Sequence, residues 1–264
     1  MTWWLAYLAI GAVVGFFAGL LGIGGGAVMV PMLVFVFTAQ GLPSEHLMHL
    51  ALGTAMATII FTSISSMRAH HRLGAVDWAV ARAIAPGIVT GAFLAALVAG
   101  FVPTRPLAGV FAVLVFYAAT QLLFDLRPKR ARALPGAGGL FAAGGVIGGI
   151  SSLLAAGGAF LCIPFLAWCS VPLRRAIGTA TAVGLPIALA GTAGYLVQGL
   201  RTAGLPQPSL GFVYLPALLL IVTTSMLAAP FGARLAHRLP VKRLRYVFAL
   251  VLYALAARML ALLW

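Results

Sequence analysis

The chain has 264 residues, of which 63% are hydrophobic and only 8% charged, and its formal net charge at pH 7 is +14. About a quarter of the residues of a soluble domain are charged, so this composition excludes a soluble globular protein and predicts one that crosses the bilayer repeatedly. The basic residues lie in short loops between apolar segments, a pattern that indicates membrane topology rather than a nucleic-acid-binding surface. No nucleic acid partner is therefore expected.

The apolar segments predict transmembrane helices. In the bilayer only helices and closed barrels satisfy their backbone hydrogen bonds, and the sequence lacks the ten-residue alternation of a barrel. The fold class is therefore predicted to be an all-α polytopic membrane protein with 8–10 transmembrane segments. The predicted segments are 4–21, 26–38, 47–66, 79–101, 107–125, 138–155, 158–170, 176–198, 210–229 and 246–263.

The first two segments are separated by three consecutive glycines, Gly24, Gly25 and Gly26, and Pro31 follows closely. As one helix, residues 5–38 would measure about 51 Å, whereas the hydrocarbon core of a bilayer is about 30 Å thick. The two pieces therefore either cross as two short helices or form a re-entrant hairpin. Both arrangements return the chain to the side on which it started.

The third segment contains Thr54, Thr58 and Thr62, which recur at i, i+4 and i+8 on one helical face. Threonine hydroxyls can donate hydrogen bonds to an anion without bringing a charge into the membrane. They also commonly bond to the backbone of their own helix, and the sequence leaves both alternatives open. Arg68, at the end of this segment, either steers anions at the inner mouth or only anchors the helix end.

The second half of the chain repeats these features. Gly157 and Gly158, followed by Pro164, form a second break, with Ser151 and Ser152 just before it. Gly178-Thr179 then matches Gly53-Thr54 at a separation of 125 residues, and Tyr214 follows Asp77 by 137. The sequence therefore predicts two repeats of about five helices each, 1–130 and 131–264, that form one transmembrane domain.

The distribution of lysine and arginine orients the segments. One threading places every one of the 17 Lys and Arg residues inside except Arg105, Arg201 and Arg258. In this threading 47–66 and its repeat partner 176–198 run in opposite directions. The two repeats are therefore predicted to have inverted topology, with both chain termini on the outer side.

The two breaks are predicted to face each other near the midplane and to bind an anion. The first N–H groups of a helix are unpaired, and the positive end of the helix dipole lies there. The alternative is that the glycines serve only close helix packing. The residues predicted to line the substrate site are Gly24, Gly25, Gly26, Thr54, Thr58, Ser151, Ser152, Gly157, Gly158, Thr179 and Arg68.

Other site chemistries find little support in the sequence. The chain has three acidic residues, Glu45, Asp77 and Asp125, and none lies at the centre of a predicted segment, so a carboxylate proton relay is not expected. Every histidine lies at a segment end, which argues against a serine hydrolase at Ser151 or Ser152. We therefore expect no enzyme activity, no metal site and no cofactor.

The order of these motifs, with the basic turn Arg68-Ala-His70-His71-Arg72-Leu-Gly74-Ala-Val-Asp77-Trp78, resembles the TauE/SafE family. The segment from Gly232 to Pro240 looks similar in the second half. The resemblance implies a permease of the bacterial inner membrane associated with export of sulfite and organosulfonates. Ala156 stands where the first break has a glycine, which implies that the two half-sites are unequal.

The favoured function is a secondary transporter that exports sulfite or an organosulfonate by alternating access. One alternative is an anion channel or a permease for other small sulfur-containing or carboxylate anions. Another is a structural or assembly protein of the membrane. The expected partners are a small anionic substrate and the lipid bilayer, with a homodimer as an open alternative.

Overall fold

The computed structural model describes residues 2–21, 25–124, 133–236 and 241–263. Within these ranges the fold is all-α, as predicted, with ten helices in the order expected from the apolar segments. The helices are α1 Thr2–Leu21, α2 Gly26–Ala39, α3 Leu47–Arg72, α4 Trp78–Ala99, α5 Thr104–Phe124, α6 Ala137–Leu153, α7 Ala159–Trp168, α8 Leu173–Leu200, α9 Leu215–Ala236 and α10 Val241–Leu263. A short 3-10 helix, η1 Ser44–His46, precedes α3.

One predicted segment begins in the wrong place. Residues 210–214 were expected to start a helix, but β1 Ser209–Leu210 and β2 Val213–Tyr214 form a two-stranded antiparallel ladder, and α9 begins at Leu215. Gly211, between the strands, has a φ of 54°, which is a left-handed conformation incompatible with a continuous helix.

Helix lengths fit a membrane protein with interrupted spans. Within the described ranges, three helical stretches are long and apolar enough to cross a membrane, namely Ser44–Arg72, Trp78–Ala99 and Leu173–Leu200. The remaining apolar helical stretches are shorter, and α2 and α7 measure only 14 and 10 residues. A ten-residue helix is about 15 Å long, which is half of the hydrocarbon core.

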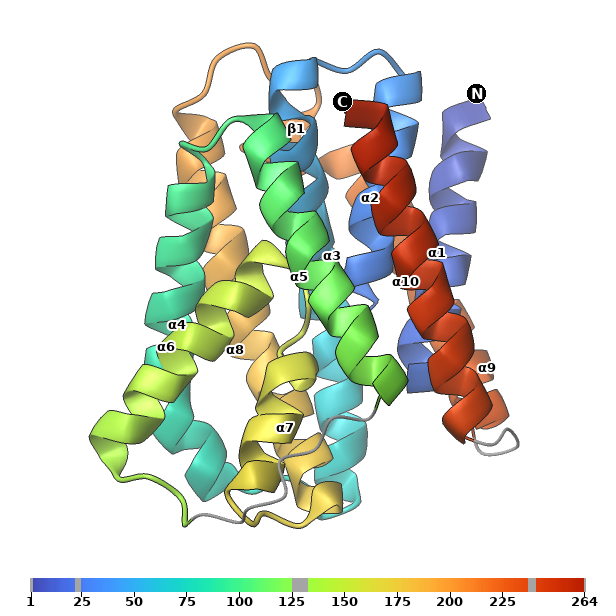
Figure 1. Ribbon diagram of the computed structural model, residues 1–264. Coiled ribbons are helices and arrows are strands. Elements are labelled where there is room, and N and C mark those ends of the chain that lie inside the picture. The colour runs from blue at the N-terminus through green and yellow to red at the C-terminus, as the bar shows by residue number, and fades with distance from the viewer. Residues whose placement is uncertain (1, 22–24, 125–132, 237–240, 264) are drawn as a thin grey trace.

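The helices alternate in direction through the molecule (Figure 1). Helices α1, α3 and α5 run downward in this view, and their counterparts α6, α8 and α10 run upward. The two ends of the chain lie at the same end of the bundle, opposite the junction of α7 and α8. These directions are the ones that an inverted arrangement requires, while the repeat boundary at residue 130 stays a prediction.

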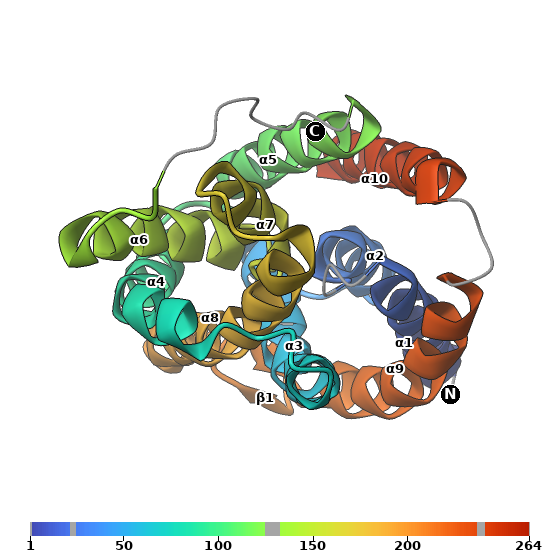
Figure 2. The same cartoon turned by 90° about the horizontal axis from the view of Figure 1, so that it is seen from below.

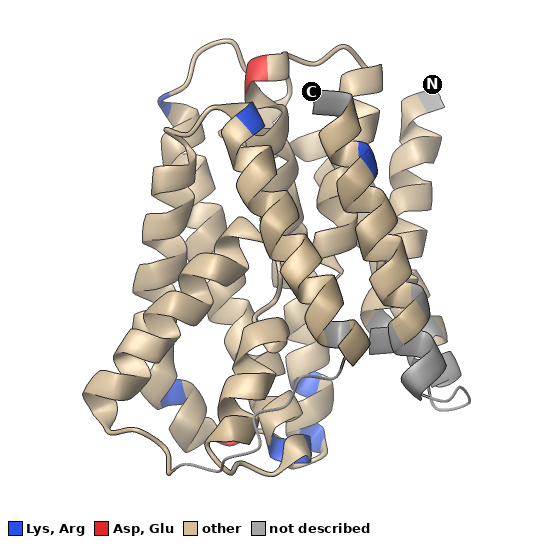
Figure 3. Ribbon diagram, in the orientation of Figure 1, with Lys and Arg blue, Asp and Glu red and all other residues tan. Residues whose placement is uncertain are grey.

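Charge is distributed unequally between the two ends (Figure 3). Ribbon segments coloured blue for Lys and Arg gather at the lower end, where α3 finishes with Arg68 and Arg72 and α8 begins with Arg174 and Arg175. The middle of the bundle is almost free of charge in the part of the chain that is drawn in colour. The positive-inside rule predicts that the lower end faces the cytoplasm.

Glycines allow the outer helices to pack closely. A Cβ atom at Gly11 of α1 would lie 2.6 Å from the carbonyl oxygen of Ile221 in α9. A Cβ at Gly87 of α4 would lie 2.0 Å from the carbonyl oxygen of Phe141 in α6. Each pair joins a helix of one predicted repeat to a helix of the other, so small residues here serve packing between the halves.

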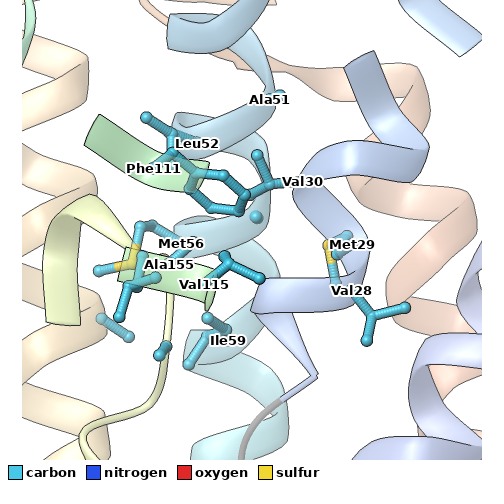
Figure 4. Packing of buried hydrophobic residues seen from close by; sticks show 14 of the residues in the cluster. Val28, Met29, Val30, Ala51, Leu52, Met56, Ile59, Phe111, Val115 and Ala155 are labelled. Atoms are coloured by element: carbon cyan, nitrogen blue, oxygen red, sulfur yellow. The ribbon is translucent and has the colours of Figure 1, made fainter. Parts of the chain in front are cut away.

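The antiparallel helices α3 and α8 lie in contact at the centre of the bundle, with α1 and α9 on one side and α4 and α6 on the other (Figure 2). Buried side chains from α2, α3 and α5 meet in one hydrophobic cluster, part of which is drawn in Figure 4. Met56 and Ile59 of α3 lie in this cluster beside Ala155, which belongs to the second break. The core of the fold therefore surrounds the broken segments.

Candidate functional site

The first break ends at a left-handed glycine. Gly25 has a φ of 65° and is the N-cap residue of α2, and no side chain caps this helix end. A residue with a Cβ atom is strained in this conformation, which explains the glycine. Gly25 and Gly26 are buried. Gly24, also predicted to line the site, lies outside the described residues.

The second break has the same local geometry. Gly158 has a φ of 77° and is the N-cap residue of α7, again without a side-chain cap. The preceding segment from Leu154 to Gly158 is buried, and Ala155 within it has a φ of 47°. Both α2 and α7 therefore begin deep in the bundle with first-turn N–H groups that no side chain caps.

The structure brings the two breaks into contact. A Cβ atom at Gly26 would lie 1.6 Å from the carbonyl oxygen of Ala155 and 3.0 Å from Cδ1 of Ile59. On the other side, the Gly157 carbonyl oxygen would lie 2.6 Å from a Cβ at Gly184 of α8. The start of α2 and the segment before α7 thus meet between α3 and α8, as the sequence predicted.

Two serine hydroxyls are buried beside this contact without a partner. Ser151 and Ser152, at the end of α6, are 1% and 0% exposed, and neither Oγ atom makes a hydrogen bond. Ser152 Oγ would lie 2.9 Å from a Cβ at Gly191 of α8. A buried hydroxyl without a partner is unfavourable, which is expected where a polar ligand completes the hydrogen bonds.

Helix α8 contains two further buried polar groups that the sequence did not single out. The hydroxyl groups of Thr192 and Tyr195 are buried and have no partner, and they follow Gly191 within about one turn. Their only signal in the sequence is their position in the same apolar segment as Thr179. That signal was too weak to separate them from ordinary polar residues of a helix.

Thr54 and Thr179 occupy matching places at opposite ends of the bundle. The Tyr214 backbone N–H donates to Thr54 Oγ1 at 3.0 Å, and the Asp77 backbone N–H donates to Thr179 Oγ1 at 2.9 Å. Each threonine therefore accepts a hydrogen bond from a loop of the other half. A role of either hydroxyl in substrate binding stays a prediction.

The other two predicted residues are a threonine that bonds to its own helix and an arginine that lies apart from the contact between the breaks. Thr58 Oγ1 donates to the Thr54 carbonyl oxygen at 2.9 Å, which is the backbone-bonding alternative that the sequence left open. Arg68 is exposed and follows Ile59 by nine positions on α3, which corresponds to about 14 Å along the helix. Any effect of Arg68 on substrate is therefore expected at the inner mouth.

The described residues contain no group of three or more His, Cys, Asp or Glu side chains that could hold a metal ion. The two cysteines, Cys162 and Cys169, are free and buried. The polar groups available at the breaks are therefore neutral: backbone amides and hydroxyls.

A model of the sulfite exporter TauE/SafE family matches residues 7–259. The chain belongs to this family. It is 37% identical over 263 residues to a protein of Haemophilus influenzae named "Probable membrane transporter protein", and the match covers 98% of each chain. Two further probable membrane transporter proteins are each 25% identical. One, from Methanocaldococcus jannaschii, matches 96% of this chain and 94% of its own, and the other, from Bacillus subtilis, matches 86% and 87%.

No solved structure gives a significant match. The family and the relatives together identify a membrane transporter.

Proposed function

We propose that this protein is a secondary transporter of small anions, most specifically sulfite or organosulfonates, with its substrate site at the contact between the two breaks. One observation carries the proposal: two uncapped helix N-termini lie with two buried, unpaired serine hydroxyls at the centre of a membrane bundle. The family name supports an anion of the sulfite type. Export across the bacterial inner membrane is the direction and location that this family suggests.

The arrangement is suited to an anion because all of its donors are neutral. The N-termini of α2 and α7 present first-turn N–H groups that no side chain caps, and the helix dipole favours negative charge there. Ser151 and Ser152 can each donate one further hydrogen bond. A site built this way compensates a small anion in the membrane without a buried cation, whose own desolvation would oppose folding.

Alternating access is supported by the way in which the two halves hold each other. The Thr54–Tyr214 bond joins the first part of α3 to β2, and the Thr179–Asp77 bond joins the first part of α8 to the residue before α4. Because α3 and α8 run in opposite directions, the two bonds lie towards opposite ends of the bundle (Figure 1). The two bonds can then close the two sides of the site in turn. No described feature favours the structural or assembly alternative, and a homodimer stays a prediction.

Counterflow in proteoliposomes tests this function. Vesicles loaded with unlabelled sulfite should accumulate labelled sulfite against its gradient, because only a carrier exchanges the two. Gly25→Leu and Gly158→Leu should abolish exchange, since both glycines have a left-handed φ and a Cβ atom would lie 2.7 Å from Val14 Cγ1 or 2.3 Å from Ile187 Cδ1, which displaces the amides of the break. Gly74→Leu is the matched control, because Gly74 also has a left-handed φ, 64°, and a Cβ atom there has nothing within 4 Å.

Two results would contradict the proposal. Rapid equilibration without counterflow would indicate a channel instead of a carrier. Normal exchange by both break variants would show that the breaks take no part in transport. Parallel assays with sulfate, taurine, sulfoacetate and small carboxylates define the substrate class.

A further inference from the structure

A buried histidine lies at the upper end of α3, above the breaks. His49 is only 2% exposed, and its Nε2 atom lies 3.1 Å from the Ala99 carbonyl oxygen and 3.0 Å from the Val102 carbonyl oxygen. Both partners are acceptors, so Nε2 must carry a hydrogen. In the neutral ring, Nδ1 is then a bare acceptor, and it is buried without any partner.

The segment that joins β1 to α9, which includes β2, packs on the same face of α3. The His49 ring stacks on Phe212 with a centroid distance of 4.9 Å and an interplanar angle of 29°. One turn further along, the Phe212 carbonyl oxygen fills the space above Gly53, 2.4 Å from where a Cβ would lie. The Tyr214 N–H then donates to Thr54. We name the segment 211–214 the outer latch.

We propose that His49 is a proton-binding site that controls the outer latch. A proton on Nδ1 would create a buried imidazolium whose second N–H has no acceptor, and a buried charge without a partner is strongly unfavourable. Release of Phe212 would let water reach the ring and solvate the charge. The open latch therefore binds the proton more tightly than the closed latch, and by linkage acid shifts the latch towards the open state.

Neighbouring charges leave the sign of this effect unchanged. The His46 ring lies 6.1 Å from His49 and 6.0 Å from Phe212, so protonation of His46 would add a second positive charge to the same contact. Tyr214 packs on Phe37 at 5.6 Å and faces the other side of the latch. Tyr7 of α1, which packs on Tyr214, and Tyr195 of α8 are buried, but a phenol carries no charge between pH 5 and pH 8. Glu45, Arg105 and Arg201, at the same end of the bundle, are exposed.

The matching position in the second half differs in its chemistry. The separation of 125 residues that relates Thr54 to Thr179 relates His49 to Arg174, which is exposed and donates to the Leu73 carbonyl oxygen at 3.4 Å. An arginine stays charged at every physiological pH, so this position offers no counterpart to a proton-binding His49. The further step, that this asymmetry couples transport to protons, rests on the proposed function, whereas the latch itself does not.

Hydrogen exchange of the segment 209–216 in the purified, substrate-free protein tests the latch directly, because it contains the Tyr214 N–H. Wild type and His49→Gln share this segment, so intrinsic exchange cancels when the two are compared at one pH. Glutamine keeps an N–H donor for the two carbonyls and cannot be protonated. We expect equal exchange at pH 8 and at least about tenfold faster exchange in the wild type at pH 5.

Two further variants complete the test. His46→Gln should keep the pH response, and Thr54→Val should exchange rapidly already at pH 8 because it loses the latch bond. Equal wild-type and His49→Gln exchange at both pH values would overturn the proposal, as would a response that depends on His46. Slow hydrogen exchange of the segment 209–216 in Thr54→Val would show that the Thr54–Tyr214 bond does not keep the latch closed. Since no substrate is present, these outcomes are independent of the transport assay.

Discussion

Replacing Ser151 or Ser152 by alanine distinguishes a ligand-binding hydroxyl from a structural one. Both Oγ atoms are buried without a hydrogen bond, and an unpaired buried hydroxyl costs about 1–3 kcal/mol. Its removal should therefore raise the free energy of unfolding of the anion-free protein by about 1 kcal/mol, at the lower end of this range. The same substitution removes one donor to the bound anion, worth about 1.5 kcal/mol, so Kd should rise about tenfold.

Thermal unfolding of the purified protein, with sulfite titrated from zero, measures both effects. For a chain of this size, about 1 kcal/mol corresponds to a Tm increase of roughly 2–4 °C. The anion-dependent part of the Tm follows the ratio of anion concentration to Kd, so it should require about ten times more sulfite in each variant.

Ser225→Ala is the matched control. Ser225 of α9 is equally buried, but its Oγ donates to the Val222 carbonyl oxygen at 3.1 Å, at the interface with α1. Its removal should lower stability slightly and leave the anion response unchanged. The reasoning is refuted if Ser151→Ala and Ser152→Ala lower the Tm and leave the sulfite dependence intact, since the hydroxyls would then serve the fold alone.

Three other predictions follow from the structure and the sequence. Gly26→Ala should abolish transport and lower the Tm, because its Cβ would overlap the Ala155 carbonyl oxygen. Gly138→Ala, with free space around it, should do neither. Unchanged transport in Gly26→Ala would show that transport does not require close contact between the two breaks. Arg68→Gln should slow anion capture and reduce its salt dependence in stopped-flow binding at two ionic strengths, and loss of all binding at any salt would make Arg68 a direct ligand. Cysteines at 40–45 should react with impermeant reagents from outside and those at 172–175 from inside; labelling of both from one side would exclude the inverted arrangement.

Much of the architecture followed from the sequence because it depends on solvent and on local chain geometry. Apolar runs of helix length, ended by glycine, proline or arginine, gave the ten helices, although α3 ends six residues later, α9 is displaced by five to seven residues and α10 begins five residues earlier than expected. The triple glycine and its weaker repeat marked the breaks, since a left-handed N-cap such as Gly25 or Gly158 needs no long-range contact to require glycine. The strands at 209–214 were missed because their apolar residues also suit a helix.

The partners of individual side chains were decided only by the tertiary structure. Thr54 and Thr58 are four residues apart on one helix, yet one accepts a hydrogen bond from Tyr214, 160 residues away, and the other bonds to its own helix. No local pattern distinguishes them, because the difference is made by a loop from the other half of the chain. His49 likewise looked like a residue at a helix end, and it is buried because Phe212 covers it. Composition and periodicity fix which segments enter the bilayer, whereas contacts across more than a hundred residues depend on how those helices pack against each other.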